Sequence, residues 1–178
     1  SILTTGGIRG GRKRVGWFQP RSFNMGITRK VFAETQGFKL ARYAEDIEFS
    51  IRMKYAGYKI GLISEAYVYH KRRTNLKQFY RQVFNFGRGR AMVGKVHPSE
   101  IKLTHWFPTF FLLVIPLISL KLSAVCNGLF LFYLLAILIH SYKEHKDVRV
   151  ALLSLPAALL QLWGYGAGFV SEKLGIIH

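Results

Sequence analysis

The chain has 178 residues, of which 50% are hydrophobic, and it carries a formal net charge of +17. Strongly basic soluble proteins are seldom this apolar, and the single cysteine, Cys126, excludes a disulfide framework and a cysteine metal cluster. Residues 1–105 hold 21 Lys and Arg against 6 Asp and Glu, a net charge of +15, whereas residues 106–178 hold 5 against 3, a net charge of +2. The sequence therefore divides into a basic front part (residues 1–105), expected to be cytosolic, and an apolar tail (residues 106–178).

The front part begins with a glycine-rich, basic segment, 1–14, that is typical of a loop. Because neither an initiator Met nor a signal-peptide pattern is present, the chain is expected to be a fragment of a longer protein. Two helices follow. The first is capped by Thr28 and stopped by Gly37, and the second runs from about Glu45 to Gly57.

Two short strands are predicted next, at 58–63 and 66–70, where β-favouring residues gather. A third helix is expected to start at a Thr74 cap and to run to about Phe86. The Gly-Arg-Gly-Arg run at 87–90 should break it. These elements predict an α/β front part with few strands for a catalytic domain.

Side chains suited to group transfer gather in this region. Glu45 and Asp46 open the second helix, His70 ends the second strand, and residues 71–73 (Lys-Arg-Arg) follow directly. A carboxylate that accepts a proton, an imidazole that binds a metal and cations that hold a phosphate are the parts needed to use a phosphorylated donor. Each also has a plainer interpretation. Helix N-termini favour carboxylates, the histidine can be a packed or surface residue, and the cations can be solvated or face lipid headgroups.

The apolar tail contains three uncharged stretches, at 106–120, 122–139 and 150–171. With flanking residues, each approaches the about 20 residues that span a bilayer. Pro108 and Pro116 weaken the first, which is a candidate re-entrant or interfacial segment. Buried helices of a soluble core are the alternative, which the scarcity of surrounding polar sequence disfavours. We therefore expect two to three transmembrane helices.

Charge predicts the orientation of these helices. Basic residues end the front part, and the short loop at 141–149 carries Lys143, Lys146 and Arg149. Positive charge stays on the cytoplasmic side and attracts anionic lipid. The expected arrangement is a protein integral to the cytoplasmic (inner) membrane, with a partial catalytic domain and juxtamembrane helix at 1–105 facing the cytoplasm and a transmembrane region at 106–178.

An ordered series of short motifs covers about residues 20–90. The series consists of Phe23-Asn24-Met25-Gly26, Arg29-Lys30-Val31-Phe32, Gly37-Phe38, Ala44-Glu45-Asp46-Ile47-Glu48-Phe49-Ser50-Ile51-Arg52, Gly57-Tyr58-Lys59-Ile60 and Val68-Tyr69-His70. It resembles the acceptor-side half of the family 2 glycosyltransferases of the GT-A fold, including their membrane-bound, bacterial-type members. The resemblance implies inverting transfer of a sugar from a nucleotide-diphosphate sugar to a lipid-linked or saccharide acceptor at the cytoplasmic membrane face.

The resemblance also implies roles for particular residues. Asp46, in the x-E-D match, would be the general base toward the acceptor hydroxyl, with Glu45 beside it, and His70 would help to bind a divalent cation, Mg²⁺ or Mn²⁺. The residues that would border or bind the substrates are Asn24, Met25 and Gly26, the Q-x-x-R pair Gln78 and Arg81, and, from the cationic run, Arg72. Gly26 can equally be a simple turn and Arg81 a juxtamembrane anchor.

Two departures limit the resemblance. No D-x-D motif, which binds metal and diphosphate in the family, occurs in the chain, so the nucleotide-binding half is expected to be missing and the isolated fragment inactive. Gln82 follows Arg81 where processive members have Trp, which disfavours polymer synthesis. A non-catalytic basic anchor that binds anionic lipid is the alternative function. Nucleic-acid binding is disfavoured by the bilayer anchor and by the acidic cluster at 45–48.

Overall fold

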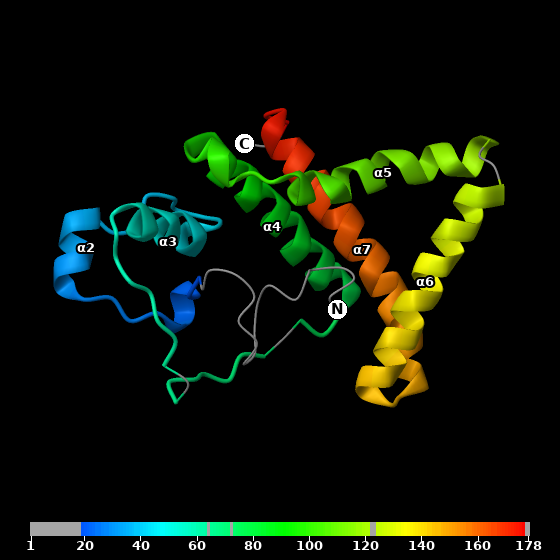
Figure 1. The fold of residues 1–178 in the computed structure, drawn as a ribbon, viewed down its shortest axis with the longest axis horizontal. Helices are drawn as coiled ribbons and strands as arrows, with labels where there is room; N and C mark the ends of the chain where they lie inside the picture. Colours follow the sequence, from blue (N-terminus) through cyan, green and yellow to red (C-terminus); the bar gives the residue numbers. More distant parts are fainter. Residues whose placement is uncertain (1–18, 64, 72, 122–123, 177–178) are drawn as a thin grey trace.

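Helices are the only regular secondary structure in the part of the chain that the computed structural model describes, which is residues 19–63, 65–71, 73–121 and 124–176. In chain order the elements are η1 (Ser22–Asn24), α2 (Arg29–Thr35), α3 (Glu45–Tyr55), α4 (Leu76–Val96), η2 (Pro98–Glu100), α5 (Leu103–Lys121), α6 (Ala124–His145) and α7 (Val148–Lys173). Figure 1 shows α2 and α3 at one end of the molecule and α5 and α6 at the other, with α4 and α7 crossing between them.

The predicted α/β fold is wrong, because no strand forms among these described residues. The predicted strands at 58–63 and 66–70 are parts of an extended segment that links α3 to α4 (Figure 1). Its side chains are largely exposed, including Ile63 at 69% and Tyr69 at 94%. An extended segment becomes a strand only when a neighbour supplies ladder hydrogen bonds and a face is buried, and an isolated pair of strands is marginal in water.

The first two predicted helices are confirmed. The Thr28 hydroxyl accepts a hydrogen bond from the Val31 backbone N–H and caps α2, which ends where Gln36 and Gly37 adopt positive φ. Helix α3 begins directly after Ala44, whose φ of 57° turns the chain so that Glu45 and Asp46 form the first turn. Both carboxylates therefore lie at the end of α3 where the helix dipole favours negative charge.

Helix α4 differs from its prediction at both ends. Asn75, and not Thr74, provides the cap, and the helix continues through 87–90 to Val96. Glycines are unfavourable in an isolated helix, but here two of them permit close packing: Gly87 faces the backbone of α7, and Gly89 faces the residues just before α3. Tertiary contact thus overrides the local tendency to break.

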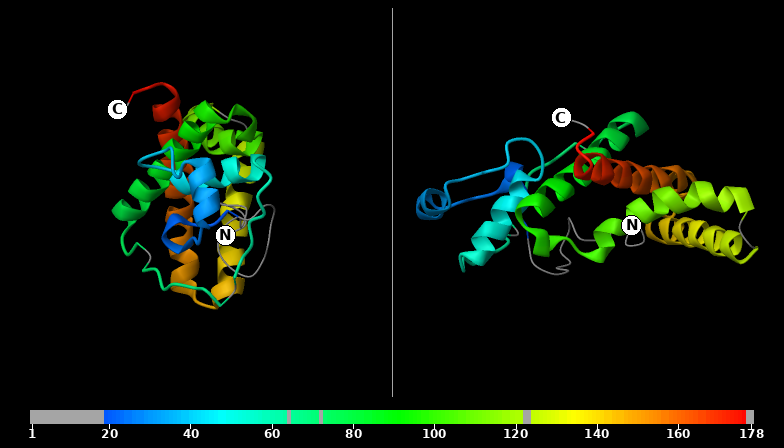
Figure 2. Two further views of the ribbon diagram at one scale, coloured as in Figure 1. Left: turned by 90° about the vertical axis from the view of Figure 1, so that its left-hand side faces the viewer. Right: turned by 90° about the horizontal axis from the view of Figure 1, so that it is seen from above.

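Helix α7 is the centre of the apolar tail. It packs against α4, α5 and α6, and α6 runs back beside it (Figures 1 and 2). The turn between α6 and α7 contains Lys146, with φ 54°, and Asp147, whose side chain accepts hydrogen bonds from the backbone N–H groups of Arg149 and Val150. The short basic loop predicted at 141–149 is therefore mostly helical: α6 runs to His145, α7 begins at Val148, and only a tight, capped turn separates them.

The prediction of two to three transmembrane helices is also wrong. Of the described helices, α7 alone is long and apolar enough to cross a membrane, and only 28% of its most apolar stretch is buried. The described residues of the apolar stretches at 106–120 and 122–139 lie in helices α5 and α6, and residues 122–123 are outside the described part of the chain. Helix α5 has 19 residues and α6 has 22, but polar residues occupy the outer turns of both, so the apolar part of each is shorter than the about 20 residues that a bilayer requires.

The close approach of α4 and α7 predicts a specific sensitivity to added volume. A Cβ atom at Gly168 would lie 2.0 Å from the Phe84 carbonyl oxygen, so Gly168→Ala must push the two helices apart. We expect it to lower the free energy of unfolding by about 1–3 kcal/mol, measured by thermal or denaturant unfolding in detergent. The control is Gly128→Ala on α6, where a Cβ meets nothing within 4 Å and should stabilise the helix by about 0.5–1 kcal/mol. Equal responses of the two variants would contradict the close packing.

Candidate functional site

The predicted site is assembled around η1. The Ser22 hydroxyl donates a hydrogen bond to Glu45 Oε1 at 3.0 Å, which ties η1 to the first turn of α3. The Phe23 ring stacks on His70 with 4.8 Å between ring centroids. The Asn24 side-chain amide donates to the Ala66 carbonyl oxygen at 3.1 Å. Three consecutive residues therefore hold the x-E-D carboxylates and the His70 segment together, although they lie far apart in the sequence.

Asp46 is the more enclosed of the two carboxylates. Its side chain is 10% exposed, and its Oδ2 atom lies 3.8 Å from Nη1 of Arg21. The guanidinium of Arg21 also lies over the Phe86 ring of α4, 5.9 Å from the ring centroid. Burial lowers the pKa of Arg21, while Asp46 and Glu45 act in the opposite direction. Arg21 thus places a positive charge beside the candidate base and links it to α4.

Sequence reasoning missed Arg21. It lies one residue before η1, outside the motifs that carry the resemblance, and is one of 26 Lys and Arg residues in the chain. The only local signal was its position just before the Phe-Asn-Met-Gly motif. Its pairing with Asp46 depends on how η1 packs against α3, which no short-range pattern reports.

His70 is exposed and reaches the site through its stack on Phe23. Within the described ranges, no group of three His, Cys, Asp or Glu side chains is placed to hold a metal ion. Zn²⁺ and other divalent cations need several such ligands together, and Mg²⁺ prefers carboxylate and other oxygen ligands. The residues described here therefore do not form a metal site by themselves, and His70 would need partners from elsewhere.

The other predicted substrate residues are more scattered. Met25 is half-buried and Gly26 exposed, with open space where its Cβ would lie, so both remain next to η1. Gln78 and Arg81 are exposed on the first turns of α4, a different element from those that hold the carboxylates. Arg72 lies outside the described residues. The structure therefore joins Asn24, Glu45, Asp46 and His70 around η1, whereas Gln78 and Arg81 belong to α4.

A buried ionic network anchors α3 behind the site. Glu48 is fully buried, and its Oε1 atom lies 2.6 Å from Nε of Arg52 and 3.3 Å from Nε2 of His97. Arg52 also donates hydrogen bonds to the backbone carbonyls of Thr35 and Gly37 at the end of α2. The sequence indicates only an i, i+4 pair of slight value. In the folded chain, the same pair connects α3 to the end of α2 through Arg52 and to the end of α4 through His97.

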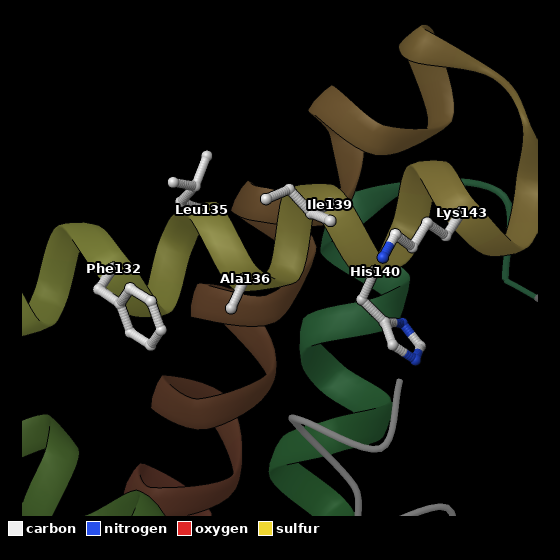
Figure 3. A pocket seen from close by; sticks show the side chains of 6 residues that line it. All are labelled: Phe132, Leu135, Ala136, Ile139, His140 and Lys143. Carbon is white, nitrogen blue, oxygen red and sulfur yellow. The ribbon is translucent and has the colours of Figure 1, made fainter.

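A groove lies far from η1, on the outer face of α6. Figure 3 shows the side chains along it, with His140 and Lys143 at one end of an otherwise apolar groove of about 360 Å³. The lining residues are Phe132, Leu135, Ala136, Ile139, His140 and Lys143. None of them is a residue of the predicted site. The groove is therefore a largely apolar helix face, separate from the carboxylates around η1.

Comparison with known families identifies the class of protein. The model of the family described as Glycosyl transferase family group 2 matches residues 22–170, which include η1, the x-E-D carboxylates, His70 and most of α7. The chain therefore belongs to glycosyl transferase family group 2. Neither the curated proteins nor the solved structures gave a match. Sugar transfer is accordingly the general activity of the family to which this chain belongs.

Proposed function

We propose that this protein transfers a sugar, with inversion, from a nucleotide-diphosphate sugar to a hydroxyl group of a lipid-linked or saccharide acceptor. Family membership supports sugar transfer in general. The observation that carries the finer proposal is the placement of Asp46: an enclosed carboxylate on the first turn of α3, beside Arg21, with the Asn24 and His70 segments held next to it by η1. That arrangement supplies a positioned proton acceptor with binding groups around it.

Asp46 acts as the general base. As the acceptor hydroxyl oxygen bonds to the anomeric carbon, the bond from that carbon to the nucleotide diphosphate breaks, and the hydroxyl proton passes to a carboxylate oxygen of Asp46. Attack from the face opposite the leaving group inverts the configuration. Arg21, 3.8 Å from Asp46, fixes the orientation of the carboxylate through charge, and Ser22 does the same for Glu45 through a hydrogen bond.

A requirement for Mg²⁺ or Mn²⁺ remains part of the proposal. Such an ion would offset the charge of a leaving diphosphate. Because the described residues do not complete a site for it, His70 would provide at most one ligand, and the others would come from a segment outside the described ranges.

Membrane attachment is proposed through α7. The helix is long and apolar, and most of its apolar stretch is not covered by the rest of the protein. The groove on α6 leaves Phe132, Leu135 and Ile139 exposed beside it, as expected for side chains that contact acyl chains. The front part, which contacts the end of α7 through Arg88 and Lys95, carries a net charge of +15 and favours the cytoplasmic side and anionic lipid. We place the front part at the cytoplasmic face of the inner membrane.

The test is a transfer assay on the native, full-length protein, since residues 1–178 lack a D-x-D motif and are expected to be inactive alone. Membranes containing it are incubated with a panel of nucleotide-diphosphate sugars, and nucleotide release and lipid-bound sugar are measured. We expect release with at least one donor, loss of release in EDTA, and recovery with Mg²⁺ or Mn²⁺. Alkaline extraction should leave the protein in the membrane. Membrane retention without transfer from any donor would instead favour the non-catalytic anchor.

A further inference from the structure

We infer that Arg88 is a positioning residue through which the apolar helix α7 sets the place of the catalytic carboxylate on α3. The inference rests on the proposed function, because it takes Asp46 as the base. Its physical basis is that α4 lies between α3 and α7 and packs against both (Figures 1 and 2). Residues 87–89, Gly-Arg-Gly, are the part of α4 where these two contacts meet.

The contact of α4 with α7 is made by the helix backbones. A Cβ atom at Gly87 would lie 2.1 Å from the Tyr165 carbonyl oxygen, and one at Gly168 would lie 2.0 Å from that of Phe84. Two helices this close have no layer of side chains between them that can rearrange. A shift of α7 at this point therefore moves α4 with it.

An ionic contact fixes the register of the same pair of helices. Glu172, near the end of α7 and 9% exposed, is held by two cations of α4. Its Oε2 atom lies 3.0 Å from both Nε and Nη2 of Arg88, and its Oε1 atom lies 2.8 Å from Nζ of Lys95. With its side chain 12% exposed, Arg88 is largely enclosed by protein, which argues against a primary role as an anchor to lipid headgroups.

Arg88 reaches the catalytic helix from the same position. Its guanidinium lies over the Tyr43 ring, 5.2 Å from the ring centroid. Next to it, a Cβ atom at Gly89 would lie 2.9 Å from the Cβ atom of Ala44, the residue that turns the chain into α3. Asp46 follows two residues later. The Arg88 side chain therefore contacts Glu172 of α7 and the residue that precedes the Ala44 turn.

The consequence is that the position of Asp46 depends on α7. A general base contributes fully only when it is held within hydrogen-bond reach of the hydroxyl it deprotonates, and a misplacement of about 1 Å can cost on the order of 100-fold in rate. Loosening the Arg88–Glu172 contact should therefore lower kcat while leaving the binding of the donor intact.

The first experiment measures kcat and the donor KM of the full-length protein for Arg88→Gln, Glu172→Gln and the double variant. We expect each single change to lower kcat on the order of 10-fold with less than about a 2-fold change in KM. The double variant should be no worse than the poorer single one, because both changes break one contact. Arg88→Lys, which keeps the charge but loses the planar group over Tyr43, should recover part of kcat. Lys77→Gln, an equal loss of charge on the exposed first turn of α4, should have no effect.

A second measurement does not need activity. In hydrogen–deuterium exchange well below the melting temperature, Arg88→Gln and Glu172→Gln should both speed exchange in residues 43–55 and leave α6 unchanged. Uniformly faster exchange would show a general loss of stability and overturn the inference, as would unchanged kcat. A raised donor KM with unchanged kcat would make Arg88 a substrate ligand instead. If the wild type shows no transfer at all, the proposed function fails, and the exchange pattern still decides whether α7 and α3 are coupled.

Discussion

Asp46→Asn in the full-length protein is expected to lower turnover by about 100-fold or more while the donor still binds. Asparagine keeps the size of the side chain and its fit at the first turn of α3, but its amide cannot take up the hydroxyl proton. General-base catalysis contributes roughly 10²–10⁴-fold, so loss of the base should appear in kcat and kcat/KM equally. The measurement is steady-state transfer with the donor identified in the panel, together with donor binding at equilibrium.

The control for this change is Asp147→Asn. Asp147 also begins a helix, and its Oδ1 atom accepts hydrogen bonds from Arg149 and Val150 at the start of α7, a role that asparagine can fill. The chemical change is the same and lies away from η1, so turnover should stay at the wild-type level. Full turnover by Asp46→Asn would remove Asp46 from the mechanism. Equal losses in both variants would point to a general effect on the helices.

The parts of the site that could be predicted from the sequence are those with local signals. The apolar spacing and acidic first turn of α3 predict a helix that opens on Glu45 and Asp46; the helix does begin at Glu45, and it ends at Tyr55, slightly before the predicted Gly57. The Thr28 cap likewise predicts the start of α2. Helix starts depend on groups within one turn of the chain, so they can be read without knowing the fold.

The errors concern features that depend on distant residues. Whether 58–63 and 66–70 form strands depends on a pairing partner, which no local pattern supplies, and the described chain provides none. Residues 87–90 look like a helix breaker because the packing of Gly87 on α7 cannot be seen in the sequence. The Arg21–Asp46 contact and the stack of Phe23 on His70 are also long-range. The resemblance nevertheless predicts that Asn24, Asp46 and His70 belong to one site, which local patterns alone could not do.

The network around Glu48 predicts the second large effect, this time on stability. Glu48 is fully buried, and Arg52, whose side chain is 14% exposed, neutralises it while also donating to two carbonyls at the end of α2. Arg52→Met keeps much of the side-chain length but removes the guanidinium and leaves the buried carboxylate with only the 3.3 Å contact to Nε2 of His97. Removing one partner of a buried ion pair costs about 3–5 kcal/mol, so we expect a loss of that size in the free energy of unfolding, measured by denaturant titration in detergent.

Two further variants identify the cause of that loss. Lys30→Met breaks a pair with the same i, i+4 spacing, Lys30 with Glu34 at 4.0 Å, but on the exposed surface of α2, and should cost only about 0.3–0.5 kcal/mol. Adding Glu48→Gln to Arg52→Met removes the unpaired charge and should recover part of the stability, because the penalty comes from the buried carboxylate and not from the missing arginine alone. A loss of stability for Arg52→Met as small as that for Lys30→Met would show that the buried pair does not hold α3 against α2. The same conclusion would follow if adding Glu48→Gln lowered the stability of Arg52→Met further, by the full amount of an independent change. Since Asp46 lies on the same helix, less than two turns before Arg52, a loosened α3 should also lower transfer. The ion pair would then be a structural requirement of the site.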